Sequence, residues 1–211
     1  MEKNHGKFGN WFKNMKIGIY GGSFNPVHNG HIHMALSAAE ELGLDKIYLV
    51  PSAVSPHRSS AEYADGKHRL EMLRLACINH PKLEPCDYEL NAGGKSYTVY
   101  TVEEFRRKFP NDELYLLVGS DMLMMFEKWY RFEEILENVT LAVVSREKGD
   151  NEKLEEKAEK LRKFGKIIIC RAEPLEISST EIRKKIVKNE IFYCYLDKNV
   201  VQYITLNSLY K

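Results

Sequence analysis

Short apolar runs alternate with segments of helical periodicity along this chain, and that alternation constrains the fold more than any other feature. Runs such as KIGIY and ELYLLVG have the length and composition of buried strands. The predicted strands are 16–20, 46–52, 82–90, 113–121, 140–146 and 166–170. The predicted helices are 32–42, 67–79, 98–108, 151–164, 177–189 and 197–207.

Strands that alternate with helices predict an α/β fold, a Rossmann-like doubly wound parallel sheet with helices on both faces. Residues 15–211 are expected to form one domain, since no internal repeat or interior linker interrupts the pattern. Residues 1–14 form a polar extension that need not be ordered. In such sheets ligands bind beyond the carboxyl ends of the strands, so functional residues are expected there.

Composition narrows the partners. The 31 Lys and Arg residues nearly balance the 30 Asp and Glu residues, which gives no electrostatic basis for a nucleic-acid or membrane partner. No apolar run is long enough to predict a membrane span. The four cysteines form no CxxC pair, which is typical of reduced thiols in a cytoplasmic protein. A homo-oligomer is compatible with the sequence.

The stretch GGSFNPVHNGH (21–31) joins the first predicted strand to the first predicted helix. Gly21 and Gly22 allow a close approach that side chains would block. The N-terminus of the following helix favours an anion, and His28 and His31 are spaced so that both rings can face one bound group. The stretch therefore predicts a phosphate site, although it is neither a GxGxxG nor a Walker A motif.

The turn also allows two other interpretations. His28, His31 and His33 could ligate zinc, but no acidic residue or cysteine stands at a familiar spacing. The histidines could also be incidental to a tight turn.

A second cluster, ISSTEIR (177–183), opens a late predicted helix. One hydroxyl of Ser178, Ser179 or Thr180 is enough to cap that helix. Three hydroxyls with Arg183 one turn further on predict a second anion site, because Arg183 shares a helix face with Ser179 and Thr180.

Together the two stretches resemble the nucleotidylyltransferase superfamily, which has an (H/T)xGH turn and a late SxSTxxR-like stretch. The segments VPSAVSPHR, KSYTVYTVEEF, LVGSDMLMMFEKWYRFEEIL and AVVSREKG, with the tail YLDKNVVQYITLNSLY, resemble the bacterial nicotinate-nucleotide adenylyltransferase family within it. The resemblance runs from Lys16 to the end and leaves out only the N-terminal extension. It implies a sheet of the nucleotidylyltransferase type.

The resemblance implies transfer of AMP from ATP to nicotinate mononucleotide, with release of pyrophosphate, in NAD biosynthesis. It implies direct in-line attack, because the nucleophile is an anionic phosphate oxygen that needs no strong base, and positioning and charge stabilisation can suffice. The resemblance implies a catalytic role for His28 and His31. The residues expected at ATP are Gly22, Ser23, Phe24, His28, His31, Gly119, Asp121, Arg146, Ser178, Thr180 and Arg183. Mg²⁺ is expected to arrive with ATP, held by phosphates and water without a protein cage.

The acceptor site is implied in the middle of the chain. The residues expected at nicotinate mononucleotide are Ser23, Arg58, Tyr97, Thr98, Asp121 and Trp129. Arg58 would bind the phosphate and stands where the family usually has lysine. Trp129 has the flat face that stacking on a pyridine ring needs, although it could also be a core residue. The long polar loop 53–66 is expected to close over substrate.

Two residues depart from the family pattern near this acceptor site. Tyr100 stands where aspartate is frequent, and Ser120 stands where alanine is usual, which puts the acceptor contacts in doubt. Nicotinamide mononucleotide remains an alternative acceptor, since it differs from nicotinate mononucleotide by one charge. Further alternatives are a phosphopantetheine adenylyltransferase, a glycerol-phosphate cytidylyltransferase and a non-catalytic nucleotide-binding regulator, which would be expected to have lost a phosphate-site residue.

Overall fold

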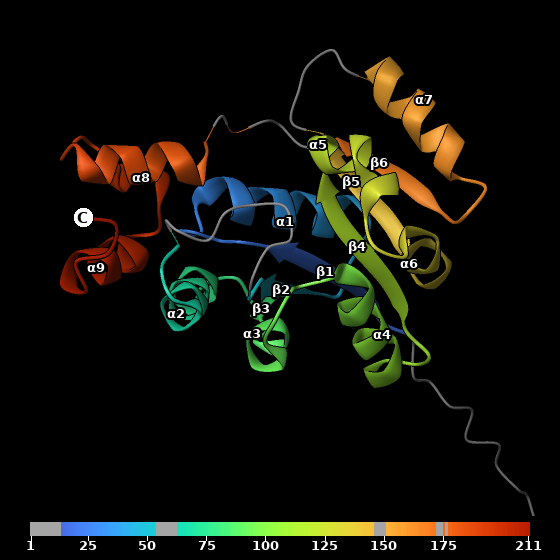
Figure 1. Ribbon diagram of the computed structural model, residues 1–211, viewed down its shortest axis with the longest axis horizontal. Coiled ribbons are helices and arrows are strands. Elements are labelled where there is room, and N and C mark those ends of the chain that lie inside the picture. The colour runs from blue at the N-terminus through green and yellow to red at the C-terminus, as the bar shows by residue number, and fades with distance from the viewer. Residues whose placement is uncertain (1–13, 54–62, 146–150, 172–174, 176) are drawn as a thin grey trace, which may run out of the picture.

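The chain folds around one parallel sheet with the strand order β3-β2-β1-β4-β5-β6 (Figure 1). The computed structural model describes residues 14–53, 63–145, 151–171, 175 and 177–211. The six strands are β1 (Lys16–Gly22), β2 (Lys46–Pro51), β3 (Leu83–Pro85), β4 (Glu113–Gly119), β5 (Thr140–Ser145) and β6 (Ile167–Arg171). The predicted α/β fold is confirmed. The strand order reverses between β1 and β4, which is where a doubly wound sheet opens a crevice for ligands.

Helices cover both faces of the sheet. The α-helices are α1 (Asn29–Glu41), α2 (Gly66–Cys77), α3 (Tyr88–Ala92), α4 (Thr98–Lys108), α5 (Ser120–Met124), α6 (Phe132–Asn138), α7 (Asn151–Leu161), α8 (Ser179–Val187) and α9 (Lys198–Leu206). Two 3-10 turns are η1 (Phe126–Lys128) and η2 (Tyr193–Tyr195). None of the helices in the described ranges combines the length and the apolar character that crossing a membrane requires.

Two apolar clusters divide the core between the faces. One contains buried residues of α1, α2, α8 and α9, and the other contains buried residues of α4, α5, α6 and α7. In the central strand, Ile17 and Ile19 belong to the second cluster, whereas a Cβ on Gly18 would lie 2.9 Å from Ile47 Cγ1 of the first. Alternate side chains of β1 thus serve opposite faces. In Figure 1, α2, α8 and α9 gather at one end of the molecule.

The predicted strand at 82–90 is wrong beyond its first residues. Pairing stops at Pro85, Cys86 N–H donates to Leu49 O at 2.9 Å, and the chain then turns into α3. This strand lies at the edge of the sheet, where proline is tolerated and pairing on one side sustains only a short ladder.

The segment after β4 also differs from expectation. The strand ends at Gly119, whereas we predicted it through Asp121, and α5, η1 and α6 fill a stretch for which no helix was predicted. Arg131, with φ 55, separates η1 from α6 in the left-handed region. Each piece is therefore too short to show a sustained helical stripe in the sequence.

Candidate active site

The turn between β1 and α1 lies at the switch point of the sheet. Gly22 ends β1, and its carbonyl accepts a hydrogen bond from Ser52 N–H at the end of β2, at 2.9 Å. A Cβ on Gly22 would lie 3.1 Å from Phe24 Cζ, so glycine leaves room for that ring. Phe24 is fully buried, with φ 45. The absence of a side chain at Gly22 therefore lets the Phe24 ring of the same chain approach the backbone closely.

The two histidines of the turn form a stacked pair. His28 is buried just before α1, His31 is partly buried in the first turn of α1, and their ring centroids are 3.7 Å apart. His31 Nδ1 accepts a hydrogen bond from His28 N–H at 3.2 Å, and the Phe24 ring meets His31 edge-on at 5.1 Å. The helix begins at Asn29, earlier than the predicted residue 32, and this brings His31 into its N-terminal turn.

The start of α8 packs directly against this turn. Ser179 Oγ donates to Pro26 O at 2.9 Å, and Arg183 Nη1 donates to Asn25 O at 2.9 Å. Two helix N-termini thus meet at one turn, and both favour anions. The two sequence stretches, more than 140 residues apart by their numbering, come together in space as expected.

The other hydroxyls of α8 have separate positions. Ser178 caps the helix, because its Oγ accepts a hydrogen bond from Glu181 N–H at 3.2 Å, and it also donates to Glu181 Oε2 at 3.0 Å. Thr180 is exposed. The capping interpretation therefore holds for Ser178, and the ATP contacts of Ser178, Thr180 and Arg183 stay predictions.

Three contacts on this turn were not predicted from the sequence. Arg69 of α2 is 2% exposed, and it donates from Nη1 to Ser23 O at 2.8 Å and from Nε to Ala64 O at 3.0 Å. Burial lowers the pKa of the Arg69 guanidinium, opposed by nearby tyrosine and carboxyl groups. The fully buried Asn25 accepts two hydrogen bonds at Oδ1, from Ala64 N–H at 3.0 Å and from Tyr210 OH at 2.8 Å.

The end of β4 supplies a second pair of predicted ATP residues. Gly119 is buried at the end of the strand, and Asp121 is exposed in the first turn of α5. A Cβ on Gly119 would lie only 2.7 Å from Asp121 Oδ1, so the carboxylate folds back over the glycine. This places a carboxylate at the carboxyl end of the strand next to β1, where ribose hydroxyls are expected to bind.

Three of the predicted acceptor residues, Tyr97, Thr98 and Trp129, lie at the start of α4 and at the end of η1. Tyr97 precedes α4 and Thr98 is its first residue, and the Tyr97 ring lies 5.0 Å from Tyr130. The partly buried Trp129 packs on Phe126, with ring centroids 4.9 Å apart and ring planes inclined by 33°. Trp129 therefore borders the core, as the alternative interpretation held, and its stacking on a pyridine ring stays a prediction.

A buried carboxyl group ties this region to β2. Glu89 is 9% exposed and accepts a hydrogen bond from Thr101 Oγ1 at 2.7 Å. Burial raises the pKa of Glu89, partly offset by hydrogen bonds from Thr101 and Ser96 and by the charge of Arg69. Ser96 Oγ also accepts from Ala53 N–H at 2.8 Å. Glu89 and Ser96 thus link the segment before Tyr97 to Ala53, two residues after the end of β2.

Two predicted cationic ligands, Arg58 and Arg146, lie outside the described residues, as does most of the loop predicted at 53–66. The two residues expected to depart from the family pattern lie beside predicted site residues, Tyr100 near Tyr97 and Ser120 next to Asp121. Tyr100 is exposed, with its ring 6.2 Å from Tyr97, and Ser120 opens α5. Among the described residues, no three His, Cys, Asp or Glu side chains form a group that could hold a metal ion, and His28, His31 and His33 form none.

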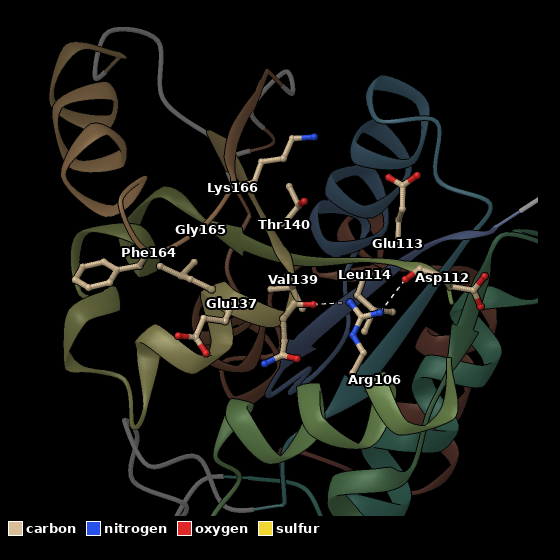
Figure 2. A pocket seen from close by; sticks show the side chains of 12 residues that line it. Arg106, Asp112, Glu113, Leu114, Glu137, Val139, Thr140, Phe164, Gly165 and Lys166 are labelled. Atoms are coloured by element: carbon tan, nitrogen blue, oxygen red, sulfur yellow. Dashed lines mark hydrogen bonds between the residues drawn. The ribbon is translucent and has the colours of Figure 1, made fainter. Parts of the chain in front are cut away.

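A cavity of about 450 Å³ lies away from this site, at the amino ends of β4, β5 and β6 (Figure 2). Its guanidinium, that of Arg106, is engaged by the main chain, since it donates to Asp112 O at 3.0 Å and to Asn138 O at 2.6 Å. Glu113, Glu137 and Lys166 also line it. Ligands of doubly wound sheets bind at the opposite edge, so the cavity is not the candidate active site.

Comparison with known proteins agrees with this geometry. The profile of the cytidylyltransferase-like family matches residues 19–185, which include both the β1–α1 turn and the start of α8. The chain belongs to this family. Among relatives of this cytidylyltransferase-like chain, a protein of Clostridium tetani named as a probable nicotinate-nucleotide adenylyltransferase is 39% identical over 93% of the chain and 99% of the relative. The nicotinate-nucleotide adenylyltransferase of Bacillus subtilis strain 168 is 33% identical, over 93% of the chain and 98% of the relative.

Solved structures show the same fold. The nicotinic acid mononucleotide adenylyltransferase of Plasmodium falciparum, in complex with NaAD, superposes with a TM-score of 0.76 at 24% identity. The superposition covers 93% of this cytidylyltransferase-like chain and 98% of that chain. The two proteins therefore share their fold over nearly the whole length of both chains. The sequence relatives make this chain a nucleotidyltransferase.

Proposed function

We propose that this chain transfers the adenylyl group of ATP to nicotinate mononucleotide and forms nicotinate adenine dinucleotide and pyrophosphate, a step of NAD biosynthesis. The observation that carries the proposal is the packing of α8 on the β1–α1 turn through Ser179 and Arg183. That packing joins the N-termini of α1 and α8 beside the stacked pair of His28 and His31. Relatives that are similar over 93% of the chain are named after this activity.

The proposed reaction requires little acid–base chemistry. A phosphate oxygen of the mononucleotide attacks the α-phosphorus of ATP, the new P–O bond forms, and the bond to the β-phosphate bridging oxygen breaks. Pyrophosphate leaves with the electron pair of that bond, and no proton need move at neutral pH. Catalysis then rests on alignment of the two nucleotides and on donors placed where negative charge develops.

In this proposal His28 and His31 donate to the phosphate oxygens of ATP as charge shifts to the leaving group. Their position at the N-terminus of α1 adds the field of the helix to their hydrogen bonds. Arg183 and the hydroxyls of Ser178 and Thr180 hold the β- and γ-phosphates, together with the N-terminus of α8. Arg183 would keep its bond to Asn25 O through one N–H group while others reach the phosphates.

The acceptor lies on the other side of the turn in this proposal. Ser23 and Arg58 hold its phosphate, Tyr97, Thr98 and Trp129 surround the pyridine ring, and Asp121 accepts from ribose hydroxyls. ATP enters as its Mg²⁺ complex, so the metal is part of the substrate. A cytoplasmic location is proposed with this reaction, in agreement with the free thiols of Cys77, Cys86, Cys170 and Cys194.

The decisive experiment is pyrophosphate release with ATP and Mg²⁺, comparing nicotinate mononucleotide, nicotinamide mononucleotide and phosphopantetheine at equal concentrations. The proposal expects strong preference for the first. Equal use of the first two would keep the reaction and change the acceptor specificity. Release with phosphopantetheine alone, or with none of the three, would contradict the proposed function.

The matched control is His31→Ala assayed with the same substrates. Loss of one preorganised donor near the reacting phosphates typically lowers turnover by about 10²- to 10³-fold. The variant should remain folded, since His31 is only partly buried. A regulator that only binds nucleotides would show no turnover in the wild type and at most a loss of affinity in the variant.

A further inference from the structure

We propose that Tyr210 is a positioning residue of the active site, which acts through Asn25 on the β1–α1 turn. The Tyr210 hydroxyl donates to Asn25 Oδ1 at 2.8 Å, across 185 positions of sequence. Neither residue is among the groups proposed to touch substrate. The inference rests on the proposed function for its kinetic test, and on nucleotide binding for an independent one.

Asn25 is the point at which four segments of the chain meet. Its side chain is fully buried, and Oδ1 accepts from Ala64 N–H at 3.0 Å as well as from Tyr210. Its main-chain carbonyl accepts from Arg183 Nη1 at 2.9 Å. Asn25 therefore connects Tyr210, which bonds its side chain, to Arg183, which bonds its main chain and is a proposed ligand of the ATP phosphates. A buried amide holds its orientation through its hydrogen bonds, and each lost donor weakens that orientation.

The hydrogen bonds on the turn also fix the direction of its peptide groups. Arg69 holds the carbonyl of Ser23 at 2.8 Å, and Ser179 holds the carbonyl of Pro26 at 2.9 Å. In a trans peptide the N–H of the next residue points opposite to the carbonyl, so Phe24 N–H and Val27 N–H point away from these donors. Donors outside the turn thus aim its N–H groups, as a phosphate-binding turn requires.

The end of the chain is built to deliver the Tyr210 side chain. Helix α9 packs on α2 through the buried Val200 and Ile204, and Tyr203 OH lies 2.9 Å from His68 Nδ1. The chain then turns back, with Ser208 at φ 50 and Tyr210 at φ 63. Both are left-handed conformations that non-glycine residues rarely adopt, and a tail with no docked side chain would have little reason to keep them.

The hydroxyl of Tyr210 acts as a donor at neutral pH. Burial raises the pKa of Tyr210, opposed by the nearby charges of Arg183 and Arg69. The protonated hydroxyl matches the amide oxygen of Asn25, which can only accept. Tyr210→Phe removes this one hydrogen bond and keeps the ring, so it tests the contact without opening a cavity.

The experiment compares the wild type, Tyr210→Phe and Tyr203→Phe. Tyr203→Phe is the matched control, because it removes a hydroxyl from the same C-terminal segment that lies 2.9 Å from His68 Nδ1 on α2. For each protein we would measure kcat, the KM values for ATP and nicotinate mononucleotide, the Kd for Mg-ATP by calorimetry, and Tm. The expected result is a roughly tenfold loss in kcat/KM for ATP with Tyr210→Phe, the size of one hydrogen bond, and none with Tyr203→Phe.

The outcomes separate the possible failures. If both variants shift Tm alike and neither changes kcat/KM or the Kd for Mg-ATP, Tyr210 has only a structural role and the inference is overturned. If the wild type binds Mg-ATP but turns over no acceptor, the proposed function fails. In that case weaker Mg-ATP binding by Tyr210→Phe alone would still support the positioning role, and unchanged binding would overturn it.

Discussion

The imidazole rings of His28 and His31 stack with centroids 3.7 Å apart and planes inclined by 31°. Gly30, which directly precedes His31 in the first turn of α1, makes that stack sterically feasible. A Cβ at Gly30 would lie 3.1 Å from His28 Nδ1 and 3.2 Å from His28 Cε1. The glycine of this turn is therefore a requirement of the His28 ring position, beyond any approach that a substrate makes.

Gly30→Ala is expected to displace the His28 ring and lower kcat by about 10- to 100-fold, because small misplacements of catalytic groups are costly. The measurement is steady-state kinetics with ATP and the acceptor, alongside Tm. Ser37→Ala, further along α1 and partly buried, is the control and should leave kcat close to the wild-type value. Unchanged kcat in Gly30→Ala would show that the observed ring position is not needed for turnover.

Arg69→Lys should destabilise the protein by about 2–3 kcal/mol, because a single ammonium cannot serve both carbonyls that the guanidinium holds, and a buried carbonyl left unpaired is costly. Those carbonyls belong to Ser23 and Ala64, at 2.8 and 3.0 Å. Urea unfolding measures the loss, and kcat/KM should fall with it, since Ser23 lies in the β1–α1 turn proposed to bind the substrates.

The control for this change lies on the same helix. Arg74 pairs with Glu71 on the exposed face at 3.2 Å. Arg74→Lys keeps the charge of a surface pair and is expected to change stability by no more than about 0.5 kcal/mol. Equal losses for Arg69→Lys and Arg74→Lys would argue against a special role for the buried guanidinium.

The sequence predicted the sheet well where strands are buried on both faces. The run ELYLLVG is continuous in apolar residues because β4 lies between β1 and β5, under helices on either side. The prediction failed at the edge strand, where alternation over 82–90 could not distinguish a three-residue strand from a strand followed by α3. Local pattern lacks the information that Pro85 ends the ladder there.

The candidate site was predictable where its residues stand in short motifs whose residue types and spacing suit a bound anion. His28, His31, Ser178 and Arg183 stand out because their types and spacing suit anions, and the fold brings their segments together. Asn25, inside the first motif, gave a weaker signal. Tyr210 stands in the tail that resembles the family, but nothing in the sequence indicated its contact with Asn25, because that contact depends on the path of the chain after α9. Contacts between distant segments are set by tertiary packing.

Gly165→Ala is expected to destabilise the protein by about 3 kcal/mol or more, because backbone must move to admit a methyl group. The added Cβ would lie 2.2 Å from Leu136 O and 3.0 Å from Leu136 Cβ, beside the cavity of Figure 2. Gly21→Ala is the control, since nothing lies within 4 Å of a Cβ there. Thermal or urea unfolding of both variants should separate them clearly; similar stabilities would contradict the close packing of Gly165 on α6.

Glu89 should make the free energy of unfolding fall as pH rises above the ordinary pKa of a glutamate carboxyl group. Its pKa is raised by burial above the ordinary value of 4.5. Between that value and the raised one, the folded protein binds a proton that the unfolded chain has lost, so stability decreases with pH across this window. Glutamine cannot ionise, so Glu89→Gln should gain stability relative to the wild type as pH rises from the ordinary carboxyl pKa of 4.5 to the raised pKa of the folded protein.

Glu104→Gln supplies a control of opposite sign. Arg107 donates to the partly exposed Glu104 carboxylate at 2.7 and 3.0 Å and lowers its pKa. That carboxylate contributes stability above its unfolded pKa, and the contribution is lost as pH falls. Glu104→Gln should therefore lose stability relative to the wild type as pH rises. Urea unfolding of the three proteins across the same pH range decides the matter: a pH-independent difference between Glu89→Gln and the wild type would mean that the Glu89 carboxyl titrates alike in the folded and unfolded chain.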